Sequence, residues 1–275
     1  MKLKGIKEIL KKHNLQPAKR LGQNFLIDER ILKKIIESAN LSKNDLLLEV
    51  GPGIGNLTIE LAKRAKKVIA VEKDKRMVEI LKERLKEERI ENVETFNEDI
   101  LKFLPSFKPK TSYKVVANIP YYLTSRLIRN LLEIKRKPKL IVLMVQKEVA
   151  QRICAKPPKM NLLAVSVQFY AKPEIVSFVS KNSFWPRPEV DSAIIKITPK
   201  KTQSKSNFCN LFFKIVKAGF SQPRKQLVNN LSKRLKIEKE KVKNWLLESG
   251  IQPTQRAETL TIENWLNLTR NFKIK

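Results

Sequence analysis

Residues 46–60, LLLEVGPGIGNLTIE, join an apolar run, a glycine-rich turn and the beginning of a helical pattern. The apolar run over 46–50 predicts a short strand that is buried on both faces. Glycines interrupt it, and the apolar spacing after them predicts a helix. A strand, a glycine turn and a helix in this order form a ligand-binding corner, because backbone N–H groups at the start of the helix point at the ligand. The glycines are Gly51, Gly53 and Gly55.

Residues 68–74, VIAVEKD, predict a second buried strand, over 67–71, that ends in Glu72. An acidic side chain in this place can accept hydrogen bonds from both hydroxyls of a ribose. A glycine turn alone is often only a tight turn, but the acid favours a nucleoside ligand. The turn lacks the lysine of a phosphate-binding loop. This favours S-adenosylmethionine, which has no pyrophosphate, over a dinucleotide.

The composition predicts a globular protein with a polyanionic partner. A chain of 275 residues with 42% hydrophobic residues can form one α/β domain and a smaller appendage. Its 57 Lys and Arg residues against 27 Asp and Glu residues give a formal charge of +30. A lysine-rich surface of the thermophilic kind explains part of this excess, but such surfaces carry nearly as much glutamate. Nucleic acid is therefore the expected partner.

Several classes of site are excluded by the residues that the chain lacks. Cys154 and Cys209 are far apart, and His13 is the only histidine, so we expect no metal site, disulfide framework or histidine-based catalysis. No apolar run approaches the roughly 18 residues of a membrane span. The N-terminus has no signal-peptide core. We predict a cytoplasmic protein with no membrane partner.

The first 50 residues, before the glycine turn, predict two helices. Residues 2–12 place apolar side chains at helical spacing between lysines, which predicts a basic amphipathic helix. Packing on the main domain or binding along RNA is favoured over membrane-surface binding by the charge of the whole chain. After KRLGQNFLID, residues 29–39 predict a second helix with Asp28 as its cap.

Eight segments, in their order and spacing, resemble one family. They are LGQNFLID, EVGPGIGNLT, VEKD, NEDI, NIPYYLTS, MVQKEVAQR, SFWPRPEVDSAI and FSQPRKQLVNNL. The chain resembles, over nearly its whole length, the adenine N6,N6-dimethyltransferases of small-subunit ribosomal RNA. The resemblance implies S-adenosylmethionine as cofactor and a methyl-donor pocket formed by matching residues. These are Asn24, Leu26, Gly51, Glu72, Asp99 and Asn118.

Asp99 follows a predicted third strand over 93–96. Its carboxylate could accept a hydrogen bond from the adenine amino group of the cofactor. The alternative is a helix cap for residues 100–104, since aspartate is a common N-cap residue. Sequence reasoning alone leaves both roles open.

Asn118, Ile119, Pro120 and Tyr121 directly follow a predicted fourth strand over 113–117. An adenine amino group is a poor nucleophile, because its lone pair is delocalised into the ring. The Asn118 oxygen and the Ile119 carbonyl, ahead of the rigid Pro120, could bind its two hydrogens and favour a pyramidal nitrogen. Tyr121 could stack on the flipped base. The alternative is an ordinary turn after a strand. A sulfonium donor requires neither a strong base nor a metal.

The segment from 123 to 199 continues the alternation of helices and strands. It predicts a helix over 123–132, a strand over 140–145 and a helix over 147–153. A final hairpin is predicted, with strands over 175–179 and 192–198. The hairpin encloses a loop with two aromatic residues, suited to stacking on an unpaired base. Phe184 matches the family position that closes over the target adenine, so we count it with the catalytic residues, whereas Trp185 either stacks or plugs the core. Residues 155–161 depart from the family pattern, as does Tyr122, where asparagine is common.

The polar segment 199–207 predicts a domain boundary. Residues 1–200 are assigned to the methyltransferase domain, and residues 201–275 to a helical RNA-binding domain. The second domain has helical patterns at 208–218, 224–235, 239–249 and 262–272, with Gly250 as a stop and Thr261 as a cap. Its basic cluster could hold RNA phosphates. The cluster consists of Arg224, Lys225, Lys233, Arg234 and Lys236.

The predicted fold is α/β: a class I S-adenosylmethionine-dependent methyltransferase domain, Rossmann-like, followed by a small all-helical domain. The resemblance implies a monomeric enzyme that dimethylates two adjacent adenosines near the 3′ end of small-subunit (16S) rRNA, coupled to small-subunit biogenesis. One alternative is the erythromycin-resistance methyltransferases of large-subunit (23S) rRNA, against which PEVDSAI and PRKQLVNNL argue. The other is a non-catalytic assembly or RNA-binding factor.

Overall fold

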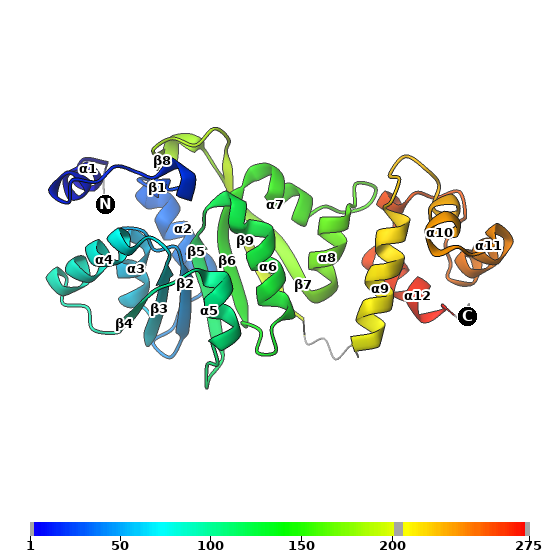
Figure 1. Cartoon of the computed structure of the whole chain (residues 1–275), viewed down its shortest axis with the longest axis horizontal. Coiled ribbons are helices and arrows are strands. Elements are labelled where there is room, and N and C mark those ends of the chain that lie inside the picture. The colour runs from blue at the N-terminus through cyan, green and yellow to red at the C-terminus, as the bar shows by residue number, and fades with distance from the viewer. Residues whose placement is uncertain (1–2, 201–205, 273–275) are drawn as a thin grey trace. The chain divides into compact units, whose positions relative to one another are not determined.

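A seven-stranded sheet of order β4-β3-β2-β5-β6-β9-β7 forms the centre of the larger, α/β part of the chain (Figure 1). Strands β2 to β6 pair in parallel, and β9 pairs antiparallel with β6. The computed structural model describes residues 3–200 and 206–272. The strands are β2 (Leu46–Val50), β3 (Lys67–Glu72), β4 (Val93–Asn97), β5 (Tyr113–Asn118), β6 (Leu140–Gln146), β7 (Ala171–Val179) and β9 (Ser192–Pro199).

Apolar runs make the central strands β2, β5 and β6 buried on both faces, as parallel strands between helices must be, whereas the edge strands β4 and β7 are only partly buried. In β6, residues 141–145 are all inaccessible to solvent. Figure 1 shows α5 and α6 on the near face of the sheet and α2 on the far face. The helices of this part are α1 (Leu3–Lys12), α2 (Glu29–Ala39), α3 (Asn56–Ala62), α4 (Lys75–Glu87), α5 (Ile100–Ser106) and α6 (Thr124–Glu133), with short 3-10 turns η1 (Lys19–Leu21), η2 (Tyr121–Leu123) and η3 (Lys181–Ser183).

The direction in which the chain builds the sheet changes at β2. From β2 the chain adds β3 and β4 on one side, and then β5 and β6 on the other. Connections that leave in opposite directions open a crevice at the carboxyl ends of the two central strands, β2 and β5. Asp28 caps α2, as predicted, by accepting a hydrogen bond from the backbone N–H of Arg30 at 3.0 Å.

The basic N-terminal helix α1 packs on the α/β part of the chain. Ile6 and Leu10 are buried against Met77 and Ile80 of α4. Lys12 of α1 pairs with Glu83 of α4. The sequence left packing on the main domain, binding along RNA and membrane-surface binding open for this helix, and the structure shows packing. Lys2, where the predicted helix begins, lies outside the described residues.

The aromatic pair at 184–185 is not in a loop, as the sequence predicted, but in strand β8 (Phe184–Trp185). It pairs antiparallel with β1 (Phe25–Leu26), so that Leu26 lies opposite Phe184 and Phe25 opposite Trp185. Trp185 packs on the core beneath α1, with the ammonium of Lys7 5.6 Å from its ring centre. This supports its role as a hydrophobic plug.

The chain divides into two compact units. The first joins Met1–Ala150 to Pro173–Pro199, and the second joins Gln151–Lys172 to Lys200–Lys275. The predicted boundary at residue 200 adjoins residues 201–205, which lie outside the described part of the chain. The second unit contains α8 (Leu162–Tyr170), α9 (Ser206–Gly219), α10 (Leu227–Leu235), α11 (Lys239–Glu248), α12 (Ile262–Arg270) and the 3-10 turn η4 (Ala257–Thr259), and α7 (Lys147–Ile153) leads the chain into it.

Helix α8 was not predicted, because LLAVSVQFY is apolar nearly all round and has no amphipathic period. It shares the core of the second unit with α9 to α12. Helix α10 begins at Leu227, three residues later than predicted. Gly250 follows the end of α11 in the left-handed conformation, and Thr261 caps α12, as predicted. Within residues 3–200 and 206–272, no helix is long and apolar enough to cross a membrane.

Candidate active site

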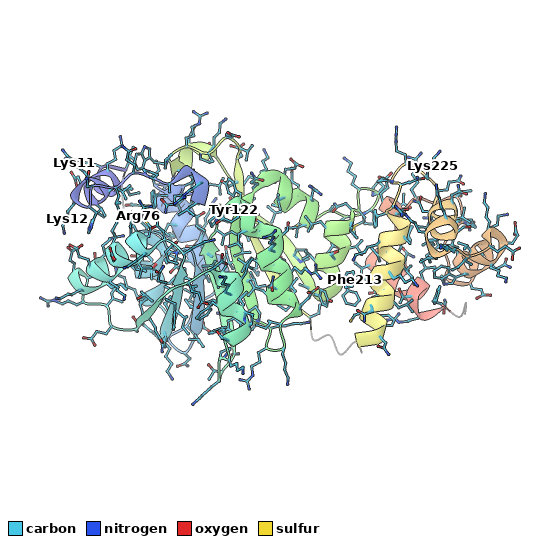
Figure 2. The ribbon with its side chains drawn as sticks, in the orientation of Figure 1. Lys11, Lys12, Arg76, Tyr122, Phe213 and Lys225 are labelled. Atoms are coloured by element: carbon cyan, nitrogen blue, oxygen red, sulfur yellow. The ribbon has the colours of Figure 1, made fainter. Side chains whose placement is uncertain are left out.

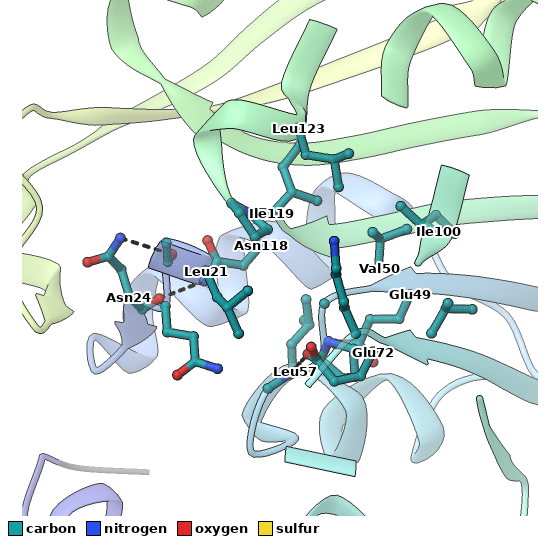
Figure 3. Close-up of a pocket in the computed structure, with 18 of the residues that line it drawn as sticks. Leu21, Asn24, Glu49, Val50, Leu57, Glu72, Ile100, Asn118, Ile119 and Leu123 are labelled. Atoms are coloured by element: carbon teal, nitrogen blue, oxygen red, sulfur yellow. Dashed lines mark hydrogen bonds between the residues drawn. The ribbon is translucent and has the colours of Figure 1, made fainter. Parts of the chain in front are cut away.

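A cavity of about 220 Å³ lies at the carboxyl ends of β2, β3 and β5 (Figure 3). The residues before β1 and the first turn of α5 complete its wall. This is the crevice that the strand order opens, and ligands of α/β sheets bind in such crevices. The cavity lies wholly in the first unit.

The glycine turn after β2 leaves no room for a side chain at Gly55. This residue has φ +87°, and a Cβ there would collide with Cδ1 of Leu81. Gly51 has φ +66°, which favours glycine, although an added Cβ there would only be in ordinary contact with Cδ of Pro120, at 3.6 Å. Gly55 therefore allows α4 to approach the turn closely.

A buried arginine holds this turn from behind. Arg84 of α4 donates to the carbonyl of Ile54 and, at 3.0 Å, to Oδ1 of Asn56. The amide of Asn56 donates in turn to the carbonyl of Leu26 at 3.4 Å. The glycine turn and the segment before α2, two walls of the cavity, are thus joined by one chain of hydrogen bonds.

Glu72 ends β3 with its carboxylate against the glycine turn. Its Oε2 accepts from the backbone N–H of Gly53 at 3.0 Å, and its Oε1 accepts from that of Asp74 at 2.9 Å. Burial raises the pKa of Glu72, while these backbone donors counteract the rise. The carboxyl group is therefore fixed in direction at the cavity wall.

Asp99 caps α5, as one of its two predicted roles requires, and its role toward the cofactor stays a prediction. Its Oδ1 caps α5 by accepting from the backbone N–H of Leu101 at 3.0 Å, and the residue lines the cavity. Its Oδ2 pairs with the ammonium of Lys73 at 2.9 Å. The bond from Lys73 holds the pKa of Asp99 below its usual range. Asp99 is thus an ionised acceptor at the rim.

The segment after β5 is held by two side-chain hydrogen bonds. The amide Nδ2 of Asn118 donates to the carbonyl of Asn24 at 3.2 Å, so this bond does not use the amide oxygen (Figure 3). The hydroxyls of Tyr121 and Ser192 are 2.7 Å apart. Burial raises the pKa of Tyr121. Both side chains therefore have fixed orientations beside the cavity.

The structure brings all but one of the predicted site residues to the cavity. Lining positions are taken by Asn24, Leu26, Gly51, Glu72, Asp99, Asn118, Pro120 and Tyr121. Phe184 does not line the cavity: it is 3% exposed and packs in the core with Leu26. In this conformation it cannot stack on a base, and its catalytic role stays a prediction.

Several lining residues were not predicted, and four of them have polar side chains that bear on the site: Glu49, Lys73, Tyr122 and Arg126. Glu49 is an acid inside an otherwise apolar strand, and this anomaly was visible in the sequence. Tyr122 is 60% exposed, and Figure 2 shows it on the first unit. Lys73 and Arg126 gave no signal, because isolated basic residues are common in this chain. In the described part of the chain, no group of three or more His, Cys, Asp or Glu side chains could hold a metal ion.

The strand order, the cavity and the acid at the end of β3 define the class I methyltransferase fold. Two solved structures share it over nearly the whole chain. A dimethyladenosine transferase from Plasmodium falciparum has a TM-score of 0.76 and 32% identity, covering 89% of this chain and 95% of that one. The 23S rRNA methyltransferase ErmE has a TM-score of 0.75 and 28% identity, covering 91% and 100%.

The sequence comparisons identify the family. The model of the ribosomal RNA adenine dimethylases matches residues 6–273. A ribosomal RNA small subunit methyltransferase A from Dehalococcoides mccartyi is 45% identical over 269 residues, 97% of this chain and 92% of the relative. The protein of the same name from Clostridium botulinum is 44% identical over 270 residues, 96% of each. The chain belongs to the ribosomal RNA adenine dimethylase family.

The protein is therefore an S-adenosylmethionine-dependent methyltransferase, and the residues of the cavity fit this cofactor. Glu72 and Asp99 offer acceptors for hydroxyl and amino groups. Oε2 of Glu49 is buried without a hydrogen-bond partner among the described residues. A ligand that carries positive charge and several hydrogen-bond donors suits this set of acids.

Replacing Gly55 with alanine is expected to weaken S-adenosylmethionine binding by about tenfold or more. Alanine would have to adopt the left-handed backbone conformation of Gly55. Its Cβ would also collide with Leu81, at a cost of roughly 1–3 kcal/mol for overpacking alone. Titration calorimetry measures the affinity. Gly250→Ala is the matched control, because Gly250 has φ +72° but open space around its Cβ position. Equal affinities in both variants would contradict this role of the turn.

Proposed function

We propose that this enzyme dimethylates N6 of two adjacent adenosines near the 3′ end of small-subunit rRNA, during assembly of the small subunit. The carrying observation is that residues 118–121 lie beside the cofactor cavity with fixed side chains. Relatives that match at least 96% of the chain are named small subunit methyltransferases. The enzyme acts as a monomer in the cytoplasm, where ribosomal subunits are assembled.

Asn118 and Ile119 act on the target adenine. The bound cofactor supplies a methyl group on a sulfonium sulfur. The amide oxygen of Asn118 and the carbonyl of Ile119 accept the two hydrogens of the adenine amino group, which makes its nitrogen lone pair more available. Pro120 keeps the carbonyl direction fixed. No side chain needs to remove a proton before the methyl group moves.

Tyr121 supplies the surface on which the flipped base stacks. The bond between its hydroxyl and that of Ser192 fixes the plane of the ring. A ring held in one orientation loses little entropy when a base stacks on it. Two transfers to one nitrogen require that the same surface accept the monomethylated base.

The cofactor is held by acceptors at the ends of the strands. Glu72 binds the ribose hydroxyls, and Asp99 binds the adenine amino group of the cofactor. The other residues of the pocket contact it through backbone groups and packing: Asn24, Leu26 and Gly51. Asn118 belongs to both parts of the site, because its bond to Asn24 links the cofactor wall to the catalytic segment.

The second unit binds the RNA backbone through exposed basic residues on and beside α10, one of which, Lys225, is marked in Figure 2. Each phosphate contact releases counterions, so binding should weaken steeply with salt. Such contacts position the RNA without reading its sequence. The residues are Arg224, Lys225, Lys233, Arg234 and Lys236.

Methyl transfer from labelled S-adenosylmethionine to unmethylated small subunits, large subunits and duplex DNA tests the proposal. We expect dimethyladenosine in the small subunit alone, identified by nucleoside analysis and mapped to adjacent positions by primer extension. The fold shared with ErmE at 28% identity makes large-subunit rRNA the alternative substrate. Label in the large subunit would establish that alternative. Tight small-subunit binding without label would make the protein an assembly factor.

A further inference from the structure

One acid of the cavity, Glu49, has no role in the proposed reaction. It is the last residue but one of β2, is 1% exposed and lines the cavity (Figure 3). Its Oε2 is buried without a hydrogen-bond partner among the described residues, and so is Oγ1 of Thr58 on α3. An unpaired polar atom that is this deeply buried costs free energy unless a ligand pairs with it. A ligand in the cavity is therefore the expected partner of Oε2 of Glu49.

The charge state of this group follows from its burial. Burial raises the pKa of Glu49 to about 8, the nearby Thr58 hydroxyl lowers it in part, and the charge of Glu72 raises it further. Near pH 7 the group is mainly a neutral carboxylic acid. A cation that enters the cavity would favour the carboxylate, because opposite charges attract strongly where water is excluded.

The other charged groups around the cavity do not replace Glu49 in this role. Lys73 at the end of β3 is paired with Asp99 at 2.9 Å. Glu72 already accepts two backbone hydrogen bonds, at 3.0 and 2.9 Å. The remaining titratable groups of the lining are Glu98, Tyr121, Tyr122 and Arg126.

We propose that Glu49 is the proton-linked residue of the cofactor pocket. It is neutral in the free protein and ionises when the cationic cofactor binds, so that binding releases a proton to solvent. The inference rests on the proposed function for the identity of the cofactor. S-adenosylmethionine carries a sulfonium charge that its product, S-adenosylhomocysteine, lacks. Ionised Glu49 therefore favours the methyl donor over the product, and the product leaves a pocket that takes up a proton again.

The affinity for S-adenosylmethionine should rise with pH. For each unit by which binding lowers the pKa of Glu49, the affinity rises about tenfold as pH increases from the pKa of the bound protein to that of the free protein. We expect about tenfold tighter binding at pH 8.5 than at pH 6, and a smaller rise for S-adenosylhomocysteine. Glu49→Gln should remove this difference between the two ligands.

Titration calorimetry in buffers of different ionisation enthalpy counts the protons released at pH 7. We expect release of most of one proton for the wild-type protein and close to none for Glu49→Gln. Glu98→Gln is the matched control, because Glu98 lines the cavity but is exposed. The amino group of the ligand titrates equally in all three proteins, so it cancels in the comparison. Equal release from wild type and Glu49→Gln would overturn the proposal.

Thermal unfolding of the free proteins gives a second, ligand-independent test. A raised pKa means that the folded protein binds more protons than the unfolded chain between about pH 4.5 and 8. The Tm of the wild-type protein should therefore fall relative to that of Glu49→Gln as pH rises through this window. Parallel Tm profiles would overturn the proposal. Methyl transfer to the small subunit without Glu49-dependent proton release would overturn this inference alone, whereas absence of cofactor binding would overturn the cofactor assignment too.

Discussion

Asn118→Ala is expected to lower the turnover of methyl transfer by about 10²-fold or more, because in the proposed mechanism it removes a fixed acceptor for the adenine amino group as charge develops. The amide of Asn118 is already oriented by its bond to the carbonyl of Asn24, so no reorganisation is needed during the reaction. The affinity for S-adenosylmethionine should fall by less, below about tenfold, since Glu72 and Asp99 remain. Single-turnover kinetics and calorimetry separate the two effects.

The control for this variant is Asn182→Ala. Asn182 is exposed in η3 and does not line the cavity, so both turnover and affinity should stay near the wild-type values. Near-normal turnover in Asn118→Ala would remove the catalytic role of residues 118–121. A loss of affinity as large as the loss of turnover would make Asn118 a cofactor-binding residue only.

The cavity residues that the sequence identified are those at strand ends. A parallel sheet brings its carboxyl ends to one edge, so Gly51, Glu72 and Asn118 had to meet once β2, β3 and β5 were recognised. The cap alternative for Asp99 proved compatible with the site, because one carboxylate oxygen caps α5 while the other faces Lys73.

What the sequence could not reveal depends on packing. Phe184 has the residue type of a stacking platform, but pairing of β8 with β1 places it in the core. Helix α8 has few polar positions because its neighbours in the second unit cover most of it. The role of Glu49 requires knowledge of its burial and of its missing partner, neither of which follows from a strand pattern.

The charge of the protein has opposite signs outside and inside the site. The whole chain has a formal charge of +30, which suits an RNA partner. The cavity is nevertheless lined by more acids than bases: Glu49, Glu72, Glu98 and Asp99 against Lys73 and Arg126. Because buried charges interact more strongly than screened surface charges, the two buried acids, Glu49 and Glu72, can select a cationic cofactor within a basic protein.

The fold is held in part by a buried ion pair away from the cavity. Lys114 of β5 is 6% exposed, and its ammonium donates to Oδ2 of Asp45 at 2.8 Å and to the carbonyl of Ala39 at 3.0 Å. It also donates to the carbonyl of Asn40. Asp45 is 4% exposed and pairs with Lys139 at 2.8 Å. Burial opposes ionisation of Asp45, but its bonds to the two lysines hold its pKa below the usual range.

Lys114→Met is expected to lower the free energy of unfolding of the first unit by up to about 3–5 kcal/mol, because it removes the buried ammonium from Oδ2 of Asp45 and from two carbonyls. Lys139 and Ser42 still bind the carboxylate, which limits the loss. Amide hydrogen exchange in β2 and β5 measures this loss in the first unit alone. The lowered pKa of Asp45 means that the pair stabilises the fold above the pKa of the unfolded chain and loses its effect as pH falls below it, so the difference between the two proteins should shrink in acid.

Lys67→Met is the matched control, since Lys67 pairs with Glu94 at 2.6 Å on the surface and should cost at most about 1 kcal/mol. If both variants lose equal stability, burial does not strengthen the pair. Asp45→Asn combined with Lys114→Met should regain part of the loss, because the buried carboxylate that has lost one of its two lysines is then replaced by a neutral amide.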